Sequence, residues 1–138
     1  MKFILSKRSY NRFKGVDPRH IALAERAIQI TPVDFGVAWM GGVRATSEQK
    51  KIFKAGNSTK DGVIKKSKHQ SGKAWDFIPF INGKVIENAW NYAMIVSAIL
   101  IAADELGFKV RSGTNWDMDN EFLTDQTFQD YGHIEIID

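Results

Sequence analysis

Residues 67–76, Ser67-Lys68-His69-Gln70-Ser71-Gly72-Lys73-Ala74-Trp75-Asp76, join a polar segment to an apolar one. The polar half is typical of a loop, and the run from Ala74 to Phe80 is typical of a strand. His69 is therefore expected on a loop, and Asp76 inside an apolar strand. A carboxylate in such a strand is costly to bury unless it has a partner or a metal. The stretch thus predicts a strand that begins beside a polar site.

A second polar group lies near the C-terminus, in Asp130-Tyr131-Gly132-His133-Ile134-Glu135. Residues 133–137 are predicted to form the closing strand, in which His133 and Glu135 share one face because side chains alternate. Glu135 fits two interpretations that the sequence leaves open. It is either a partner that orients a metal-binding residue or an outward charge on an edge strand.

His69, Asp76 and His133 together form a set of two histidines and one carboxylate. Three protein ligands with an open fourth position are typical of catalytic zinc rather than structural zinc. Such a site needs a nearby carboxylate to move a proton, and Asp130 is a candidate. The pattern alone leaves another interpretation open, in which His69 is a loop histidine, Asp76 caps a strand and His133 is a core histidine.

Elsewhere the sequence predicts helices and strands without a βαβ rhythm. The predicted helices run from Asp17-Pro18 to Thr31-Pro32, from Thr46 to Gly56, and from Asn88, apolar almost all round, to Gly107. The predicted strands cover residues 35–40, 74–80, 85–86, 108–111 and 133–137. Residues 57–68 and 112–130 are expected to be irregular, and 57–68 to be an exposed loop.

Two turn and cap signals support this assignment. Ile81-Asn82-Gly83-Lys84 is typical of a hairpin turn. Thr46 and Gln49 fit a capping box, with Thr46 as N-cap and Gln49 reaching back. The predicted fold class is α+β, a small antiparallel sheet packed against helices, in a single domain over residues 1–138.

The composition is that of a globular chain with a divided charge. The 138 residues include no cysteine, which excludes disulfides and thiolate nucleophiles. Residues 1–68 carry 15 Lys and Arg against 5 Asp and Glu, whereas residues 69–138 carry 4 against 11. The basic half is expected to attract anionic envelope polymers, or else to be a solvated surface. A nucleic-acid module is disfavoured because the basic loop at 57–68 has no aromatic residue to stack on bases.

The sequence does not predict an export signal or a membrane span. The apolar run Phe3-Ile4-Leu5 is too short for a signal-peptide core. The most apolar stretch, residues 93–103, is about half the length that a bilayer span needs. We therefore expect synthesis in the cytoplasm.

The string Ser67-x-His69-x-x-Gly72-x-Ala74-x-Asp76, followed by Asp130-x-x-His133, resembles the zinc peptidases of the D-Ala-D-Ala carboxypeptidase and VanX group, whose core hedgehog domains share. Within that group the chain is most similar to the small phage endolysins that are L-alanyl-D-glutamate peptidases. The resemblance runs from about Asp17 to the C-terminus. It implies a single domain of the hedgehog and D-Ala-D-Ala-peptidase type, without a separate wall-binding domain.

The resemblance also implies roles for individual residues. His69, Asp76 and His133 correspond to the three ligands of one catalytic Zn²⁺. Asp130 corresponds to the catalytic carboxylate, which is Asp rather than Glu in the L-alanyl-D-glutamate branch. Arg44 corresponds to the arginine that contacts the scissile carbonyl and its oxyanion. Ser67 matches the motif serine, which either bonds substrate or holds the loop.

The function that follows is that of a phage endolysin, a zinc endopeptidase that cuts the L-Ala–D-Glu bond of peptidoglycan stem peptides for host lysis. It would accumulate in the cytoplasm of the infected cell and reach the wall in the periplasm after the membrane is permeabilised. Two alternatives stay open: a D-Ala-D-Ala carboxypeptidase or dipeptidase, and a non-catalytic hedgehog-like zinc-binding module.

Three further expectations concern residues outside this set. Asp117, Asp119 and Glu121 alternate in an acidic loop, which either binds Ca²⁺ or is simply solvated. His20 is predicted to be a surface or packing residue. The sequence shows no oligomer seam, so a monomer is expected.

Overall fold

The computed structural model describes residues 3–115, 118 and 130–138 of the chain. The helices are α1 (Lys7–Arg12), α2 (Pro18–Ile30), α3 (Thr46–Lys54) and α4 (Ala89–Leu106), with a 3₁₀ turn, η1 (Lys68–Ser71). The strands are β1 (Asp34–Val37), β2 (Ala74–Ile81), β3 (Lys84–Val85), β4 (Val110–Ser112) and β5 (His133–Ile136).

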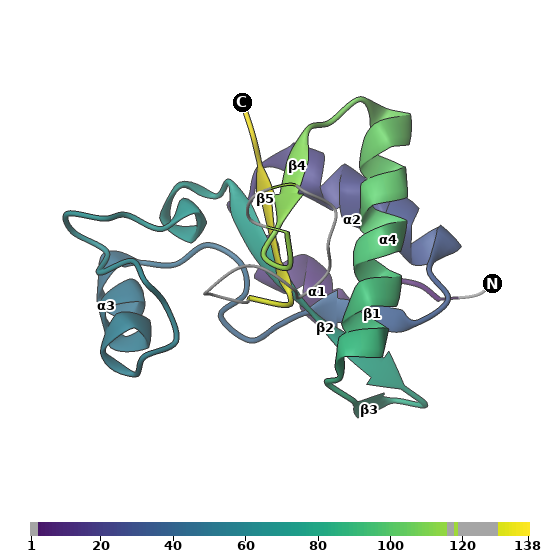
Figure 1. Ribbon diagram of the computed structural model, residues 1–138, viewed down its shortest axis with the longest axis horizontal. Coiled ribbons are helices and arrows are strands. Elements are labelled where there is room, and N and C mark those ends of the chain that lie inside the picture. The colour runs from purple at the N-terminus through teal and green to yellow at the C-terminus, as the bar shows by residue number, and fades with distance from the viewer. Residues whose placement is uncertain (1–2, 116–117, 119–129) are drawn as a thin grey trace.

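The strands form one antiparallel sheet with β2 at its centre (Figure 1). Their order is β1-β2-β5-β4, and β3 pairs with the far end of β2 through the predicted hairpin. Asn82 and Gly83 at that turn have φ of 50° and 78°, the left-handed conformation that a tight hairpin turn requires. The α+β class and the antiparallel sheet predicted from the sequence are confirmed.

Alternation along β2 and β5 separates a core face of the sheet from a polar face. Trp75, Phe77 and Ile134 are almost completely buried and join one core with residues of α2 and α4. Asp76, His133 and the other residues of opposite parity point away from that core. The central strand therefore carries core and site on its two faces.

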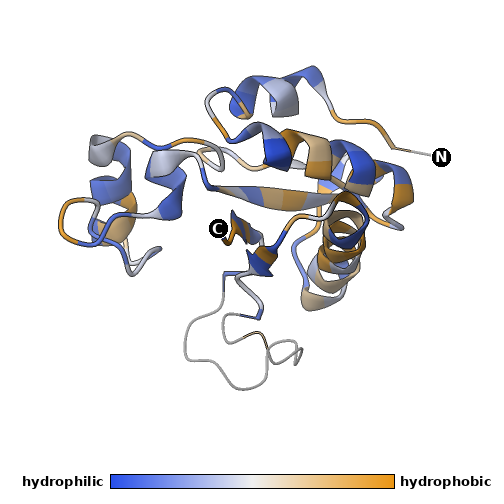
Figure 2. Ribbon diagram, turned by 90° about the horizontal axis from the view of Figure 1, so that it is seen from above, coloured by the Kyte–Doolittle hydropathy of each residue, from blue (hydrophilic) through white to orange (hydrophobic). Residues whose placement is uncertain are grey.

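Helix α3 and the loop after it lie apart from the helices that cover the core. Both views place them at the side of the sheet opposite α4, and Figure 2 shows their mostly hydrophilic colouring. Most of residues 57–68 is exposed, as predicted, although Gly62 and Ser67 are buried. This lobe forms one wall of the site described below.

The helix boundaries differ from the prediction in two places. Helix α1 was not predicted, because six residues are too few to show a helical period; Ser9 on α1 accepts a hydrogen bond from the backbone of Val37 and so covers the edge strand β1. Helix α3 has Ala45, not Thr46, as N-cap, and the backbone N–H of Ala45 donates to Glu48. Gln49, which was expected to reach back to the cap, is instead buried.

Helix α4 begins after Asn88 and ends before Gly107, as predicted. Only part of its apolar surface is buried, because Trp90 and Ile101 are mostly exposed. By length and composition alone α4 is apolar enough to cross a membrane. Its other side, including Ile95 and Ile99, is buried in the core of the domain, which is the arrangement of a core helix.

Candidate active site

The sheet register places two of the polar residues directly opposite each other. Asp76 on β2 pairs with His133 on β5, and Ala74 pairs with Glu135. Because residues i and i+2 share a face, Asp76, His133 and Glu135 all project from the polar face of the sheet. Two of the three predicted ligands, Asp76 and His133, therefore come from strands that are neighbours in the sheet.

The third residue, His69, is delivered by the turn η1. The Ser67 hydroxyl accepts a hydrogen bond from the His69 backbone N–H, and Gly72 ends the turn with φ of 75°. A side chain at Gly72 would also meet the carbonyl oxygen of Gly15 at 2.6 Å. The motif glycine is therefore required both by its conformation and by close packing.

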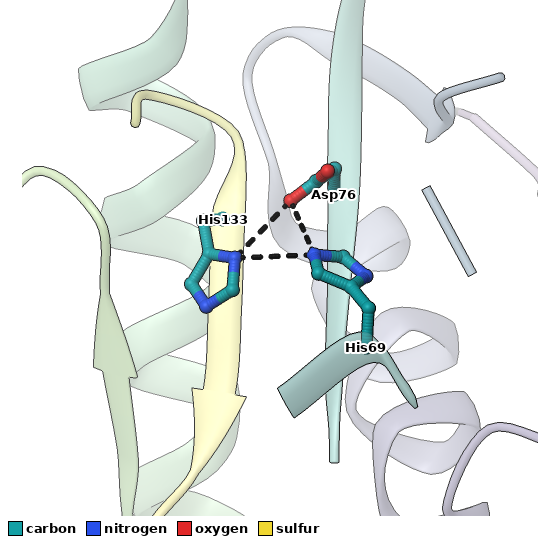
Figure 3. A group of neighbouring side chains, drawn as sticks. All are labelled: His69, Asp76 and His133. Atoms are coloured by element: carbon teal, nitrogen blue, oxygen red, sulfur yellow. Dashed lines mark hydrogen bonds and ion pairs between the residues drawn. The ribbon is translucent and has the colours of Figure 1, made fainter. Parts of the chain in front are cut away.

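His69, Asp76 and His133 bring three atoms together in a nearly equilateral triangle (Figure 3). His69 Nε2 lies 3.2 Å from His133 Nδ1 and 3.2 Å from Asp76 Oδ1, and His133 Nδ1 lies 3.3 Å from the same oxygen. Ligands at ordinary zinc bond lengths in a tetrahedron are separated by about 3.3 Å. The triangle therefore has the size that a tetrahedral metal site needs.

Neighbouring acceptors fix which ring nitrogens of the two histidines face the triangle. His69 Nδ1 lies 3.0 Å from the carbonyl oxygen of Gly42, which accepts only, so Nδ1 carries the proton. His133 Nε2 lies 2.8 Å from Glu135 Oε1, so Nε2 carries the proton of the neutral ring. Each neutral ring consequently points a lone pair at the centre of the triangle.

Asp76 completes the set of converging lone pairs. Its Oδ1 is buried, and no group among the described residues donates a hydrogen bond to it. Burial alone would raise the pKa of Asp76, but the positive charges that His69 and His133 carry when protonated hold the pKa well below its ordinary value. A buried carboxylate oxygen and two imidazole lone pairs facing one another are stable together when a cation lies between them. The group could hold a metal ion.

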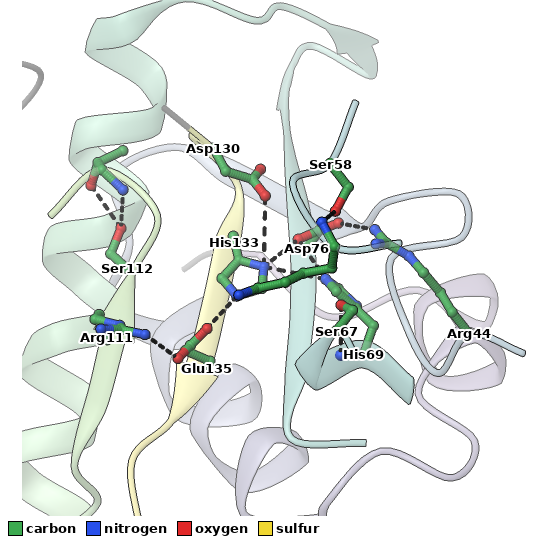
Figure 4. A network of polar contacts seen from close by, with 12 residues as sticks. Arg44, Ser58, Ser67, His69, Asp76, Arg111, Ser112, Asp130, His133 and Glu135 are labelled. Atoms are coloured by element: carbon green, nitrogen blue, oxygen red, sulfur yellow. Dashed lines mark hydrogen bonds and ion pairs between the residues drawn. The ribbon is translucent and has the colours of Figure 1, made fainter. Parts of the chain in front are cut away.

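Glu135 is buried and connects the histidine to an arginine (Figure 4). Its Oε1 accepts from His133, and its Oε2 lies 2.8 Å from Arg111 Nη2. Burial would raise the pKa of Glu135, but His133 and Arg111 outweigh it and lower the pKa to about 2. Of the two interpretations left open by the sequence, the geometry favours the partner that orients a histidine.

Asp130 lies beside the triangle without belonging to it. Its Oδ2 is 3.7 Å from His133 Nδ1. Burial, together with the nearby charge of Asp76, raises the pKa of Asp130 to about 6. A carboxyl group with this pKa exchanges a proton readily near neutral pH.

The backbone of Asp130 is held against Gly113. The N–H of Asp130 donates to the Gly113 carbonyl at 3.2 Å, and the N–H of Gly113 donates to the His133 carbonyl at 2.8 Å. A Cβ atom at position 113 would lie 2.0 Å from the Asp130 carbonyl oxygen. The absence of a side chain at Gly113 therefore sets where Asp130 stands relative to His133.

Arg44 reaches the site from the loop between β1 and α3. Its Nη2 donates to Asp76 Oδ2 at 2.9 Å, its Nη1 to Gln49 Oε1 at 3.1 Å, and its Nε to the carbonyl of Met40 at 3.0 Å. The guanidinium group has five N–H donors, and these three bonds use one on each nitrogen. Among the described residues, the second N–H of each terminal nitrogen has no acceptor, so both can donate to a ligand.

The residues enclose a cavity of about 350 Å³ on the polar face of the sheet. Two acidic groups and the two histidines line one side, and basic and polar residues of the α3 lobe line the other. The lining residues are Arg44, Asn57, Ser58, Thr59, Lys60, Lys66, Ser67, Lys68, His69, Arg111, Asp130, His133 and Glu135.

Comparisons with known proteins identify the family and the fold. The model of the family described as phage L-alanyl-D-glutamate peptidase matches residues 1–137. The chain belongs to this family. It is 32% identical to the L-alanyl-D-glutamate peptidase of Escherichia phage T5, over 99% of this chain and 100% of the relative. The crystal structure of the Serratia marcescens L-Ala D-Glu endopeptidase ChiX matches with a TM-score of 0.80 and 27% identity, over 97% of this chain and 90% of that one.

Family membership confirms the resemblance drawn from the two motifs, and with it a peptidase fold and class. The structure brings together all the residues that the sequence singled out around the motifs, with Ser67 both lining the cavity and holding η1. The acidic residues 117, 119 and 121 lie outside the described residues. His20 is buried, with Nε2 2.9 Å from the Lys73 carbonyl, so it is a packing residue.

Gln49 is the residue of this region that the sequence analysis misread. It is completely buried and bonds Arg44, Ser58 and Lys60. Its helical position resembled that of a capping residue, and no local pattern distinguishes a cap from a side chain that turns inward to a loop. Only the packing of α3 against residues 57–60 separates the two.

Proposed function

We propose that this chain is an endopeptidase that hydrolyses the L-Ala–D-Glu bond of peptidoglycan stem peptides, with Zn²⁺ held by His69, Asp76 and His133. The observation that carries the proposal is the triangle of three lone pairs beside Asp130, inside a cavity large enough for a peptide segment. We take the identity of the scissile bond, L-Ala–D-Glu, from the names of the family and of its relatives. Two histidines, one carboxylate and an open position are the ligand set of catalytic zinc.

Bound zinc would lower the pKa of a coordinated water towards neutrality and polarise the scissile carbonyl. The protein's own contribution to proton transfer is Asp130. Its carboxylate takes a proton from the attacking water and later gives it to the nitrogen of D-Glu as the C–N bond breaks. The position of Asp130 beside His133 supports this role, because the attacking atom must lie within reach of both the base and the open side of the triangle.

Arg44 stabilises the negative charge that develops on the carbonyl oxygen. Its side chain is only 11% exposed, and the bonds to Asp76 and Gln49 hold the guanidinium in one orientation. A donor that is already oriented needs no reorganisation when the charge forms. Arg44 also bonds the second oxygen of Asp76, so it orients the first oxygen towards the triangle.

The experiment that tests this function is digestion of defined stem peptides, followed by mass spectrometry of the products. The zinc-loaded chain is expected to release a fragment that ends in L-Ala and one that begins with D-Glu, and the chain stripped of metal to release neither. Free D-Ala would establish the D-Ala-D-Ala peptidase instead. A zinc-loaded chain that cleaves no stem peptide would establish the hedgehog-like binding module.

The basic N-terminal half suits an enzyme that works on an anionic envelope. In this proposal the phage protein is made in the host cytoplasm, meets the wall after the membrane is breached and is held there by long-range attraction. Wall binding should then fall steeply between about 50 mM and 300 mM salt. If charge reversal of Lys60, Lys65 and Lys66 changes neither wall binding nor its salt dependence, these lysines have no role in wall binding.

A further inference from the structure

A second cavity of about 460 Å³ adjoins the active-site cavity across Arg44, Lys66, Ser67 and Lys68, which line both. Its remaining lining residues are Ala45, Thr46, Gln70 and Ser71. Three of the eight lining residues are basic and none is acidic. The active-site cavity has these three basic residues together with Lys60 and Arg111, but it also includes the carboxyl groups of Asp130 and Glu135. The second cavity, called the cationic groove below, therefore lies beside the active-site cavity and has no carboxyl group next to its cations.

The basic residues of this groove differ in whether they form salt bridges. Arg44 is paired with Asp76. The salt bridges found among residues 3–115, 118 and 130–138 include none to Lys66 or Lys68, and both lysines are exposed. The hydroxyl of Thr46 is a further donor, because its recorded hydrogen bond from Gln70 uses only its lone pair. The groove thus offers positive charge and donors to an anionic group.

The proposed substrate carries its negative charge on only one side of the scissile bond. On the carbonyl side of the scissile bond, L-Ala contributes only a methyl group. On the amine side, D-Glu has two carboxyl groups, and the peptide continues through only one of them. The other remains an anion close to the scissile nitrogen unless it is amidated.

We propose that the cationic groove is the subsite for the amine side of the stem peptide, and that Lys66 and Lys68 bind the free carboxylate of D-Glu. This inference rests on the proposed function and adds the direction in which the substrate lies. The carbonyl side then lies towards Asn57 and Thr59 in the active-site cavity, and the leaving amine lies towards η1. An amidated stem peptide should bind less well, because it lacks the charge that the two lysines face.

The test compares two soluble peptides that differ only in this group, one with D-Glu and one with its amide, D-isoglutamine. We expect the zinc-loaded wild type to prefer the acid by about tenfold in kcat/KM, the size of one charge-assisted contact. The double variant Lys66→Gln, Lys68→Gln should lose that preference through a higher KM for the acid, with a much smaller change in KM for the amide. Lys50→Gln, Lys51→Gln on α3 is the matched control, since neither residue lines the groove.

The outcomes separate this inference from the function on which it rests. A wild type that cleaves both peptides equally overturns the subsite, as does a preference that persists in the double variant, and in either case the peptidase assignment stands. A wild type that cleaves neither peptide overturns the function as well. A preference for the acid that disappears only in the groove variant supports the subsite.

An independent observation concerns the buried amide of Gln49. Its Oε1 accepts from Arg44 Nη1 at 3.1 Å, and its Nε2 donates to Ser58 Oγ at 3.0 Å and to the Lys60 carbonyl at 2.8 Å. The side chain is completely buried. One amide therefore joins the arginine of the site to the loop that forms the opposite wall of the cavity.

We infer that Gln49 is a positioning residue that acts through Arg44. Without its carbonyl acceptor, Nη1 would lose one of the three bonds that fix the guanidinium plane, and the donor would no longer be oriented before the charge forms. Because the interaction is needed when the oxyanion develops, its loss should lower kcat more than it raises KM. A merely structural amide would lower stability without changing the kcat of the folded enzyme.

Gln49→Met, which keeps the size of the side chain and removes its polar atoms, tests this role with zinc content and thermal unfolding measured in parallel. We expect kcat to fall about tenfold in the wild-type background and to be unchanged by the same substitution in Arg44→Ala. Gln49→Glu keeps the acceptor for Arg44 but turns a second acceptor towards the Lys60 carbonyl, so it should restore only part of kcat. Asn91→Leu, which removes another buried amide far from the site, should lower only the unfolding temperature.

An equal loss of kcat from Gln49→Met in both backgrounds would contradict action through Arg44. So would a wild-type kcat in the Gln49→Met single variant. If Arg44→Ala itself cleaves as fast as the wild type, both the role of Arg44 and that of Gln49 are wrong, although the peptidase assignment stands.

Discussion

His133 Nε2 lies 2.8 Å from the Oε1 of Glu135, two residues further along the same strand. A carboxylate at this nitrogen fixes the neutral ring with its lone pair on Nδ1, which is the nitrogen that faces His69 and Asp76. Arg111 holds the other oxygen of Glu135 at 2.8 Å. The nitrogen of His133 that faces the triangle is thus set by the buried Glu135, which is held in turn by the partly exposed Arg111.

Replacing Glu135 should therefore weaken metal binding more than folding. In Glu135→Ala the ring keeps its place on β5 but loses the group that holds its proton on Nε2. We expect zinc affinity to fall about 10- to 100-fold, as measured by competition with a chromophoric chelator. Glu135→Gln keeps an acceptor at this place and should lose less. Unchanged affinity in the alanine variant would show that Glu135 does not orient the ligand.

Metal uptake should release a proton from His133. Burial lowers the pKa of this residue, but its bonds to Asp76 and Glu135 outweigh burial and raise the pKa to about 9. A metal binds only the neutral ring at Nδ1, so at pH 7.5 it must displace a proton that the free site still holds. Affinity should consequently rise with pH up to about 9 and decline below it.

Isothermal titration of the metal-free protein in two buffers with different ionisation heats measures this release directly. We expect about one proton per ion at pH 7.5 and about a tenfold change in affinity per pH unit. The same affinity at pH 6.5 and 8.5, with no release, would mean that His133 is already neutral.

Gly113→Ala should disturb Asp130 while leaving the metal ligands in place. The new methyl group would lie 2.0 Å from the Asp130 carbonyl oxygen, so the chain before β5 must shift. We expect a stability loss of about 1–3 kcal/mol and a fall in kcat, with zinc content unchanged. Unfolding by denaturant and peptide hydrolysis measure the two effects.

Gly107→Ala is the control for that variant. It strains a left-handed C-cap with φ of 75°, at a position where no atom lies within 4 Å of the added Cβ, and so costs about 1 kcal/mol without touching the site. If both variants lose kcat in proportion to stability, Gly113 has no special effect on Asp130.

The two motifs predicted the site because each is local in sequence. Asp76 and His133 lie on strands whose alternation is visible in the residues, and pairing of those strands makes them neighbours. His69 is held by a serine cap and a glycine that both belong to the same motif. Fold class followed from the same reasoning, since the hairpin at Asn82-Gly83 implies antiparallel pairing.

Contacts between segments that are distant in the sequence could not be predicted from local patterns. The position of Gln49 on a short polar helix gives no sign that its side chain turns inward to Arg44 and Ser58. Helix α1 is too short to show a helical period in the sequence. Its role is visible only in the fold, where Ser9 and Arg12 form hydrogen bonds with the backbone of Val37 on the edge strand. Likewise, the overall apolar character of α4 concealed the exposed side that carries Trp90, because one-sided burial is decided by what packs against the helix.

The central claim is that one group of residues holds a catalytic metal and that Asp130 moves the proton. The most direct measurement compares wild type and Asp130→Asn for bound zinc and for hydrolysis of purified peptidoglycan. The account predicts one zinc in both proteins, with hydrolysis by Asp130→Asn lower by about 10²- to 10⁴-fold. Hydrolysis by Asp130→Asn at the wild-type rate would contradict the role of Asp130, and a wild type that binds zinc but leaves every wall intact would contradict the peptidase.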